Sequence, residues 1–197
     1  MYLVHKIDFT THIHLRPSFF PDKIWSHLIR SGKSSGYRNF ETDYAKRFKN
    51  TGFLDWKVLN PKIHTIRRDK ENALKKGDGI IPVIYKGTFS EFEFAPTLEI
   101  KSIQEIEIEY DRTKDMQPII TIDGKTLKPI GFIAPYRRNE KLSINELKEA
   151  RRYDNFFTDL CLNCGFDLEE DFIRFFPENY NGKIIHFTDF KYNLCNY

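Results

Sequence analysis

The stretch "GIIPVIYKGTFSEFEFAPTLEIKSIQEIEIEY", residues Gly79 to Tyr110, decides the fold of this chain. It begins with a β-rich run, continues with phenylalanines that alternate with polar residues, and ends with isoleucines that alternate with charge almost strictly. A period of two residues is typical of strands with one face in the core and one face in water. The stretch therefore predicts several strands of a mainly antiparallel sheet.

A hairpin and a returning strand are predicted further along the chain. In "PIITIDGKTLKPI", residues Pro118 to Ile130, Asp123 and Gly124 separate two short β-prone runs. An Asp-Gly pair in that position is a strong signal for a two-residue hairpin turn. The segment "GKIIHFTDFKY", residues Gly182 to Tyr192, has the composition of a last strand that returns to the sheet.

Two helices are predicted between the hairpin and the last strand. Ser143 and the acid three residues after it have the spacing of a capping box, and a helix is expected from Ile144 to about Cys161. Asp167 and Glu170 repeat that spacing at the start of a shorter helix, which Pro177 ends.

The N-terminal residues predict two more helices. Asp22 precedes a run whose apolar residues share one helical face, namely Ile24, Trp25, Leu28 and Ile29. A second helix is expected from Glu41 to about Lys49. The predicted fold class is therefore α+β, with helices around a mainly antiparallel sheet or small barrel.

Composition narrows the class of protein. A chain of 197 residues with 15% aromatic residues is long and apolar enough for one globular domain. No apolar run approaches the roughly 18 residues of a membrane span, and the first residues lack a signal-peptide pattern, so we expect a cytoplasmic protein. Three cysteines, an odd number, favour reduced thiols, and the single Cys161-x-x-Cys164 pair is too little for a zinc site. We expect no metal and no cofactor.

The segment "NPKIHTIRRDKENALKKGD", Asn60 to Asp78, concentrates positive charge. The net charge of the chain is only +3, yet six lysines and arginines fall between residues 62 and 76, beside His64 and the nearby Lys57. They are Lys62, Arg67, Arg68, Lys70, Lys75 and Lys76. Such a run favours an anionic partner, although a solvated charged loop is the commoner outcome.

Within this segment, "KIHTIR" at Lys62 to Arg67, followed by "KKGD" at Lys75 to Asp78 and a β-rich run, resembles the signature of ASCH domains in the PUA-like superfamily. The segment "GFDLEEDFIRFFPENYNGKIIHFTDF" resembles the closing helix and strand of larger ASCH-like proteins, several of which are carried by bacteria and phages. The resemblance implies one PUA-like domain over residues 1–197: a small β-barrel flanked by helices, with residues 1–55, a helical extension, and 111–142 as additions to the common core.

The resemblance also implies a cleft and a chemistry. Family members are thought to bind RNA or nucleotides, and some resemble amidohydrolases that act on N4-acetylcytidine, with a lysine as base and a threonine as nucleophile. Lys62 and Thr65 match those two positions. The expected acid does not match, because Cys164 occupies its place, and Asp167 or Glu170 would have to replace it. Three neighbouring cations would help to lower the pKa of the lysine, namely His64, Arg67 and Arg68.

Three functions follow as expectations. The first is binding of RNA or a modified nucleoside in one cleft lined by Lys62, Thr65 and Arg67, with Arg68 on phosphate and Trp56 as a stacking residue. The second is an amidohydrolase for an N4-acylated cytidine-type nucleoside, with Lys62, Thr65 and Glu170 as catalytic residues. The third is a phage or host-defence interaction protein with a protein partner.

Several of these residues also have plain structural interpretations. Lys62 and Arg67 would then be surface charges, and Thr65 a strand residue facing solvent. His64, in an extended segment, is expected to point away from Lys62 and Thr65 and to serve as a core residue. In addition to Trp56, two aromatic residues are candidates for an exposed surface that stacks on bases, namely Tyr85 and Tyr136.

Overall fold

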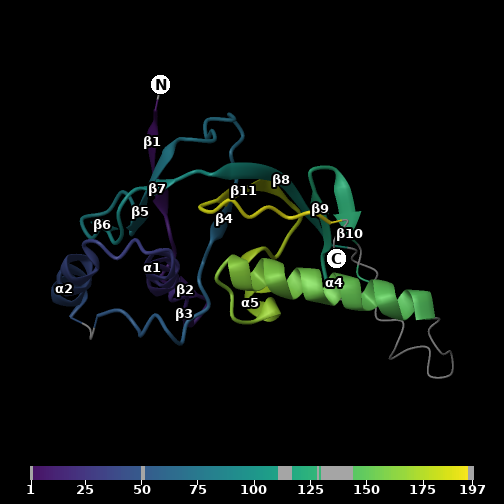
Figure 1. The fold of residues 1–197 in the computed structure, drawn as a ribbon, viewed down its shortest axis with the longest axis horizontal. Helices are drawn as coiled ribbons and strands as arrows, with labels where there is room; N and C mark the ends of the chain where they lie inside the picture. Colours follow the sequence, from purple (N-terminus) through teal and green to yellow (C-terminus); the bar gives the residue numbers. More distant parts are fainter. Residues whose placement is uncertain (1, 50–51, 111–116, 128, 130–143, 195–197) are drawn as a thin grey trace.

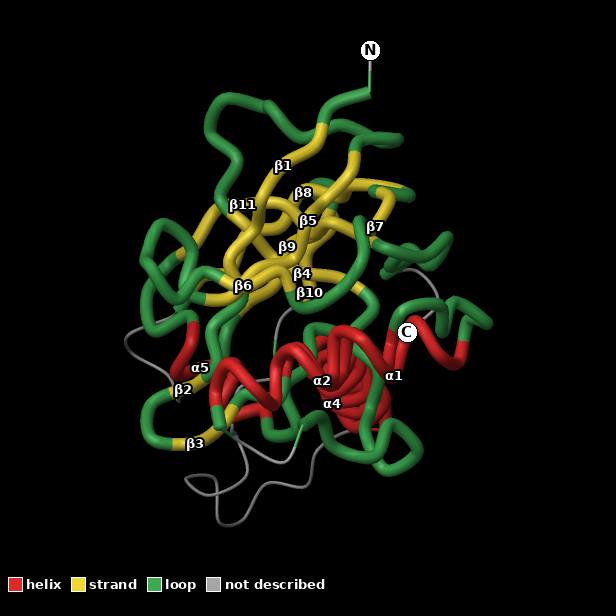
Figure 2. The backbone as a smooth tube through the Cα atoms, turned by 90° about the vertical axis from the view of Figure 1, so that its left-hand side faces the viewer, coloured by secondary structure: helices red, strands yellow, loops and turns green. Residues whose placement is uncertain are grey.

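The two larger sheets and the long helices occupy opposite sides of the molecule. The computed structural model describes residues 2–49, 52–110, 117–127, 129 and 144–194. In both views the two sheets lie above α1, α2 and α4 (Figure 1 and Figure 2). The predicted α+β class is confirmed. Within the described residues the strands form three sheets, and none of them closes into a barrel.

The first sheet unites the N-terminal strand with the stretch that begins at Gly79. Strand β1 (Val4–Asp8) pairs in parallel with β5 (Gly79–Ile84). Two short strands, β6 (Phe92–Glu93) and β7 (Leu98–Glu99), pair antiparallel with the two ends of β5. The sequence did not predict this parallel pair, and residues 1–55 therefore contribute a strand as well as helices to the fold.

The second sheet has the strand order β10-β9-β8-β11-β4. The long strand β8 (Ser102–Glu109) buries every second residue, as the alternation predicted. Strands β9 (Ile119–Ile122) and β10 (Lys125–Leu127) form the predicted hairpin, with positive φ at Asp123 and Gly124 in the turn. The last strand, β11 (Tyr180–His186), lies between β8 and β4 (His64–Arg67).

The predicted helices are present, with shifted boundaries. Helix α1 spans Phe20–Arg30 and α2 spans Tyr37–Phe48. Helix α4 spans Ile144–Asn163, but Ser143 of its predicted capping box lies outside the described residues. Helix α5 spans Glu169–Phe175, and its N-cap is Leu168, so the predicted capping role of Asp167 is wrong. A small hairpin, β2 (His12–Ile13) with β3 (Arg16–Pro17), precedes α1.

One hydrophobic core joins the two sheets to the helices. It includes α1, in which almost every residue from Phe20 to Leu28 is buried. It also includes the C-terminal half of α4, with Phe156, Phe157 and Leu160. Phe89 lies outside it: this side chain is fully exposed in a turn, although its alternation with Phe92 and Phe94 predicted a strand. Local periodicity predicted these elements but not how far each strand extends.

Candidate functional site

The motif segment forms β4 and the residues that flank it. Strand β4 is the edge strand of the second sheet, and its register with β11 pairs Arg67 with Lys183 and His64 with His186. Lys62 and Thr65 are both 2% exposed, whereas Arg67 is half-buried and Arg68 exposed. The segment therefore passes from the core to the surface within a few residues.

Lys62 is a buried lysine at the end of α4. Its Nζ donates a hydrogen bond to the carbonyl of Cys164 and lies 4.3 Å from the ring centroid of Phe20. Desolvation lowers the pKa of Lys62 to about 7, and the nearby positive charges of Arg67 and Lys23 act in the same direction.

A second buried lysine lies beside it. Lys23 of α1 donates to the carbonyl of Gly165 at 2.7 Å and forms an ion pair with Asp167 at 2.8 Å. Lys62 and Lys23 thus bind consecutive carbonyls just after α4, where cations stabilise a helix C-terminus. This contact gives Lys62 a structural role that does not depend on catalysis.

His64 is a fully buried core residue, as predicted, but it does not point away from Lys62. Its Nε2 lies 3.0 Å from the Sγ of Cys164, the residue whose carbonyl Lys62 contacts. Lys62 precedes β4, and both Lys62 and Arg67 approach the ring of Phe9, at 5.9 Å and 5.0 Å from its centroid. Within β4, Thr65 and Arg67 are two residues apart and share the face opposite to that of His64.

A row of buried polar residues crosses three strands on the His64 face. The sheet registers pair Ser102 of β8 with His186 of β11, and His186 with His64. All three are buried, and the His64 and His186 rings are 5.2 Å apart. Within the described residues no hydrogen-bond partner reaches Ser102 Oγ, His64 Nδ1 or either ring nitrogen of His186. Desolvation lowers the pKa of both histidines, that of His186 to about 4.

Sequence reasoning missed the row that Ser102 and His186 form with His64. Ser102 occupies one of the alternating, buried positions of β8, and His186 is flanked by apolar residues. Polar residues in core-facing strand positions were the available signal, because burial of an unpaired polar group is costly.

Arg67 and Arg68 line an open pocket at the other end of β4, which we call the arginine pocket. It has a volume of about 230 Å³ and is lined by Ile66, Arg67, Arg68, Phe175, Phe176, Pro177, Glu178, Asn179 and Tyr180. The guanidinium of Arg68 lies 4.9 Å from the centroid of the Tyr180 ring. Arg67 donates to the carbonyl of Asp8 at 2.6 Å and lies 5.0 Å from the Phe9 ring.

The other predicted site residues lie elsewhere. Lys62 and Arg67 both approach the Phe9 ring, but neither Lys62 nor Thr65 lines the arginine pocket. Trp56 is half-buried, and its carbonyl accepts a hydrogen bond from Ser26 in α1. Glu170 is exposed on α5 beside Arg174, at 3.6 Å. Among the predicted site residues, Lys62 and Thr65 are thus buried, whereas Arg67 and Arg68 line the arginine pocket.

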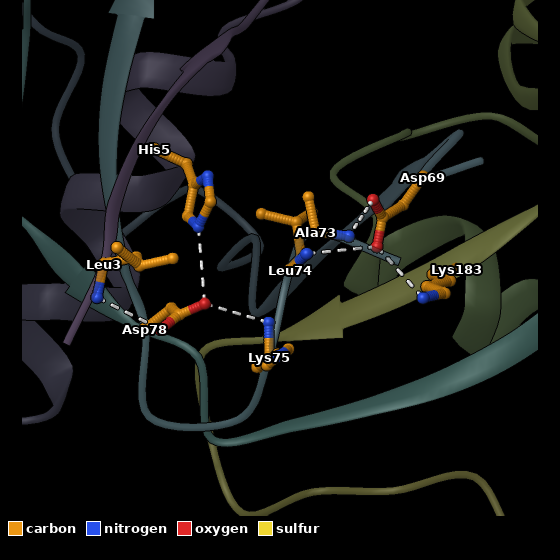
Figure 3. Close-up of polar contacts among 8 residues, drawn as sticks. All are labelled: Leu3, His5, Asp69, Ala73, Leu74, Lys75, Asp78 and Lys183. Carbon is orange, nitrogen blue, oxygen red and sulfur yellow. Dashed lines mark hydrogen bonds and ion pairs between the residues drawn. The ribbon is translucent and has the colours of Figure 1, made fainter. Parts of the chain in front are cut away.

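Two carboxylates hold the basic loop that follows β4 (Figure 3). Asp69 accepts hydrogen bonds from the amides of Ala73 and Leu74 and forms an ion pair with Lys183 at 3.0 Å. Asp78 accepts from the amides of Leu3 and Lys75 and lies 3.3 Å from His5. Hydrogen bonding lowers the pKa of both aspartates despite their desolvation. The loop is thus fastened at both ends, with its lysines exposed.

No protein-family model, curated protein or solved structure matched the chain. The site is therefore interpreted from its own geometry. Among the residues that the structure describes, no group of three or more His, Cys, Asp or Glu residues could hold a metal ion. In the same residues no helix has the length and apolar character needed to cross a membrane.

The cysteines add little reactivity to the site. Cys161 and Cys164 are free and buried, and Cys195 lies outside the described residues. Desolvation raises the pKa of the Cys164 thiol to about 12 and that of Cys161 further, so both stay protonated at neutral pH. A buried neutral thiol cannot replace the acid that the amidohydrolase interpretation requires.

Proposed function

We propose that the protein binds RNA or a modified nucleoside through the arginine pocket. The observation that carries this proposal is the lining of one open cavity by two arginines and a tyrosine, Arg67, Arg68 and Tyr180, with the Arg68 guanidinium 4.9 Å from the centroid of the Tyr180 ring. Guanidinium groups bind phosphate in bidentate geometry, and an aromatic face stacks on a base of any sequence. Unpaired RNA offers both groups at once.

The two arginines have different roles in this proposal. Arg67 is held by the carbonyl of Asp8 and the ring of Phe9, and within the described residues its buried Nε has no hydrogen-bond partner. These contacts hold Arg67 in place, so it contributes a fixed positive charge beside the pocket. Arg68 is exposed, and its guanidinium is free to move between the Tyr180 ring and a ligand.

The basic loop strengthens the field around the pocket. Lys70, Lys75 and Lys76 are exposed on a loop that Asp69 and Asp78 hold in place. Fixed positive charges near a binding site raise the local concentration of an anionic polymer and its association rate.

We also propose that the fold is PUA-like and of the ASCH type. The support is the order of the motif strand, the basic loop with Gly77 and Asp78, the β-rich run and the late helix followed by a strand. In this proposal residues 1–55 and 111–142 are additions to the common core.

An amidohydrolase remains the second candidate, because the pKa of Lys62 near 7 suits a general base at neutral pH. Its substrate would be an N4-acylated cytidine-type nucleoside, with Thr65 as nucleophile. Asp167 binds Lys23 and Glu170 is exposed beside Arg174, so an acid would have to move toward Lys62. Turnover that disappears in Thr65→Val but survives in Ser102→Ala would support this candidate.

A salt titration of RNA binding tests the main proposal. Affinity for a short single-stranded RNA should fall by roughly 0.7 log units per tenfold increase in salt for each phosphate that is neutralised. Arg68→Ala should reduce that slope by about one contact, whatever the RNA sequence. Lys70→Ala is the matched control, since it removes one exposed charge from the same segment but outside the pocket.

Two further variants sharpen the titration. Thr65→Val should leave the slope unchanged, because it removes a buried hydroxyl and no charge. Tyr180→Leu should weaken binding of every sequence by about 1–3 kcal/mol without changing the slope. RNA binding that Arg68→Ala and Lys70→Ala weaken equally would exclude the arginine pocket as the site.

A further inference from the structure

A second pocket lies in the N-terminal part of the chain. We call it the N-terminal pocket; its volume is about 330 Å³, and it lies between the β2–β3 hairpin, the start of α1, the end of α2 and the residue after β5. This volume is close to the lower end, about 300 Å³, of the range for small-molecule sites. Tyr85, one of the aromatic residues expected to stack on a base, lines it, whereas Tyr136 lies outside the described residues. No residue of the arginine pocket lines it.

Aromatic rings form one wall of this pocket. The ring centroids of Tyr44 and Phe48 are 5.0 Å apart, and those of Phe48 and Tyr85 are 5.5 Å apart. All three residues line the cavity, and none of them is fully buried. Tyr85 OH lies 3.3 Å from Thr11 Oγ1, which links this wall to the hairpin. A planar ligand could therefore lie against rings that are already in position.

Two of the lining residues have an unusual backbone conformation. Phe19 has φ 53° and Tyr85 has φ 56°, both in the left-handed region. Bulky residues rarely adopt this region, because it places Cβ too close to the backbone. Such strain persists only where the surrounding structure holds it, and it gathers at ligand sites. In this protein the strained conformation occurs at two aromatic residues that line the same cavity.

Asp22 is the acidic residue of this pocket, which Thr11, His12, Tyr44 and Tyr85 also line with polar side chains. Asp22 is 7% exposed, and its Oδ1 accepts a hydrogen bond from the amide of Leu54 at 2.7 Å. Desolvation raises its pKa, which reflects the cost of keeping a negative charge among aromatic and proline side chains. A carboxylate only accepts hydrogen bonds, so a ligand that relieves this cost must bring hydrogen-bond donors, such as the N–H groups of an amino substituent.

We propose that the N-terminal pocket binds a nucleobase that carries an exocyclic amino group, with cytosine as the simplest case. The aromatic wall would stack on the base, and Asp22 would accept hydrogen bonds from the amino group. Uracil presents a carbonyl at the corresponding position, and the carboxylate would repel it. This inference rests on the proposed function only in taking nucleic acid as the ligand class.

The fold connects this pocket to the arginine pocket. Phe175, the last residue of α5, lines the arginine pocket, and α5 packs against β2, whose His12 lines the N-terminal pocket. One RNA strand could therefore place a phosphate at the arginines and an unpaired base at the N-terminal pocket.

Free nucleosides test this inference separately, because they carry no phosphate. We would titrate the protein with cytidine and with uridine by NMR, and expect cytidine to bind at least about fivefold more tightly. Asp22→Asn should reverse the preference for cytidine over uridine. The side-chain oxygen of the asparagine can still accept the hydrogen bond from the amide of Leu54. Phe48→Leu should weaken both nucleosides about tenfold, since it removes one stacking ring. Phe89→Leu, which removes a fully exposed ring that lines neither pocket, should change neither.

The outcomes separate the two proposals. Equal binding of cytidine and uridine, or a cytidine preference that Asp22→Asn leaves intact in a folded variant, would overturn the N-terminal site. A loss of cytidine binding in Tyr180→Leu would move the base to the arginine pocket and would also overturn it. Cytidine binding that depends on Asp22, combined with RNA affinity that does not respond to Arg68→Ala, would uphold this site and refute the proposed function.

Discussion

At the scale of single residues, Lys62 combines a structural contact with an unusual protonation state. Its ammonium binds a carbonyl at the end of α4 while apolar rings and two other cations surround it. The carbonyl favours the charged form, and desolvation favours the neutral form more strongly, so the pKa falls to about 7. A buried lysine of this kind is costly to the fold near neutral pH.

This cost predicts an unusual alkaline stabilisation. The unfolded chain binds a proton at Lys62 up to about pH 10.5, but the folded protein releases it near pH 7. Over that window the free energy of unfolding should gain up to about 1.4 kcal/mol per pH unit from this residue. Lys62→Met should lose that gain, and urea unfolding near pH 7.5 and near pH 9.5 would measure it.

Lys70→Met is the control for this experiment. Lys70 is exposed in the same segment, so the variant should keep the pH dependence of the wild type. Identical pH dependence in wild type and Lys62→Met would show that the lysine is charged in the fold, and it would also remove the support for Lys62 as a base.

At the scale of elements, the contact between β4 and β11 decides the shape of the arginine pocket. Gly182 of β11 allows this contact, because a Cβ there would come within 2.6 Å of the carbonyl oxygen of Arg67 and of the Tyr180 ring. Both neighbours are part of the pocket. Because Gly182 has no side chain, β4 and β11 can lie at this short distance.

Gly182→Ala should therefore damage the fold and the site together. We expect a loss of about 1–3 kcal/mol in the free energy of unfolding, since overpacking forces the strands apart. RNA affinity should fall in the fraction that remains folded. Gly124→Ala is the comparison: its Cβ meets nothing within 4 Å, and its φ of 73° costs about 1 kcal/mol.

The comparison has a clear readout. Both variants should lower the urea midpoint, but only Gly182→Ala should change RNA affinity at equal folded fraction. Unchanged affinity in Gly182→Ala would mean that the spacing of β4 and β11 does not determine binding.

The elements also show where sequence reasoning succeeded. Hairpin β9–β10 and helices α1, α2 and α4 were predictable, because turn residues and hydrophobic periodicity are local properties. The parallel pairing of β1 with β5 was not, since it joins residues 75 apart, Val4 and Gly79. The buried row through Ser102, His186 and His64 depends on sheet register, which no local pattern specifies.

At the scale of the whole molecule, several titrating groups act in the same direction under acid. His64 and His186 are buried in the neutral form, and the pKa of each is lowered. Asp69 and Asp78 have lowered pKa values, so the fold favours their charged forms. In every case the unfolded chain binds more protons than the folded protein as the pH falls, so acid should destabilise the fold.

His186→Phe should make the protein less sensitive to acid. The wild type should lose up to about 1.4 kcal/mol per pH unit through His186 between pH 6.5 and about 4. Phenylalanine has a similar shape and no unpaired nitrogens, so stability at neutral pH should be kept or increased. Urea unfolding near pH 7 and near pH 5 would compare the two proteins.

The same variant tests whether the polar row has a function. A more stable His186→Phe with lower RNA affinity or turnover would indicate that the row is kept for activity at a cost in stability. An equal loss of stability on acidification in both proteins would show that His186 does not titrate as its burial indicates.

The place of β11 in the second sheet has a consequence for the order of folding. The motif strand β4 is at the edge of that sheet and pairs only with β11. Its residue His64 is 122 positions before its partner His186, and Arg67 is 116 positions before Lys183. During synthesis the motif leaves the ribosome long before its partner exists. It must wait, with apolar residues uncovered, until residues 180–186 arrive and close the sheet. Chaperones would therefore meet this protein with β4 still unpaired.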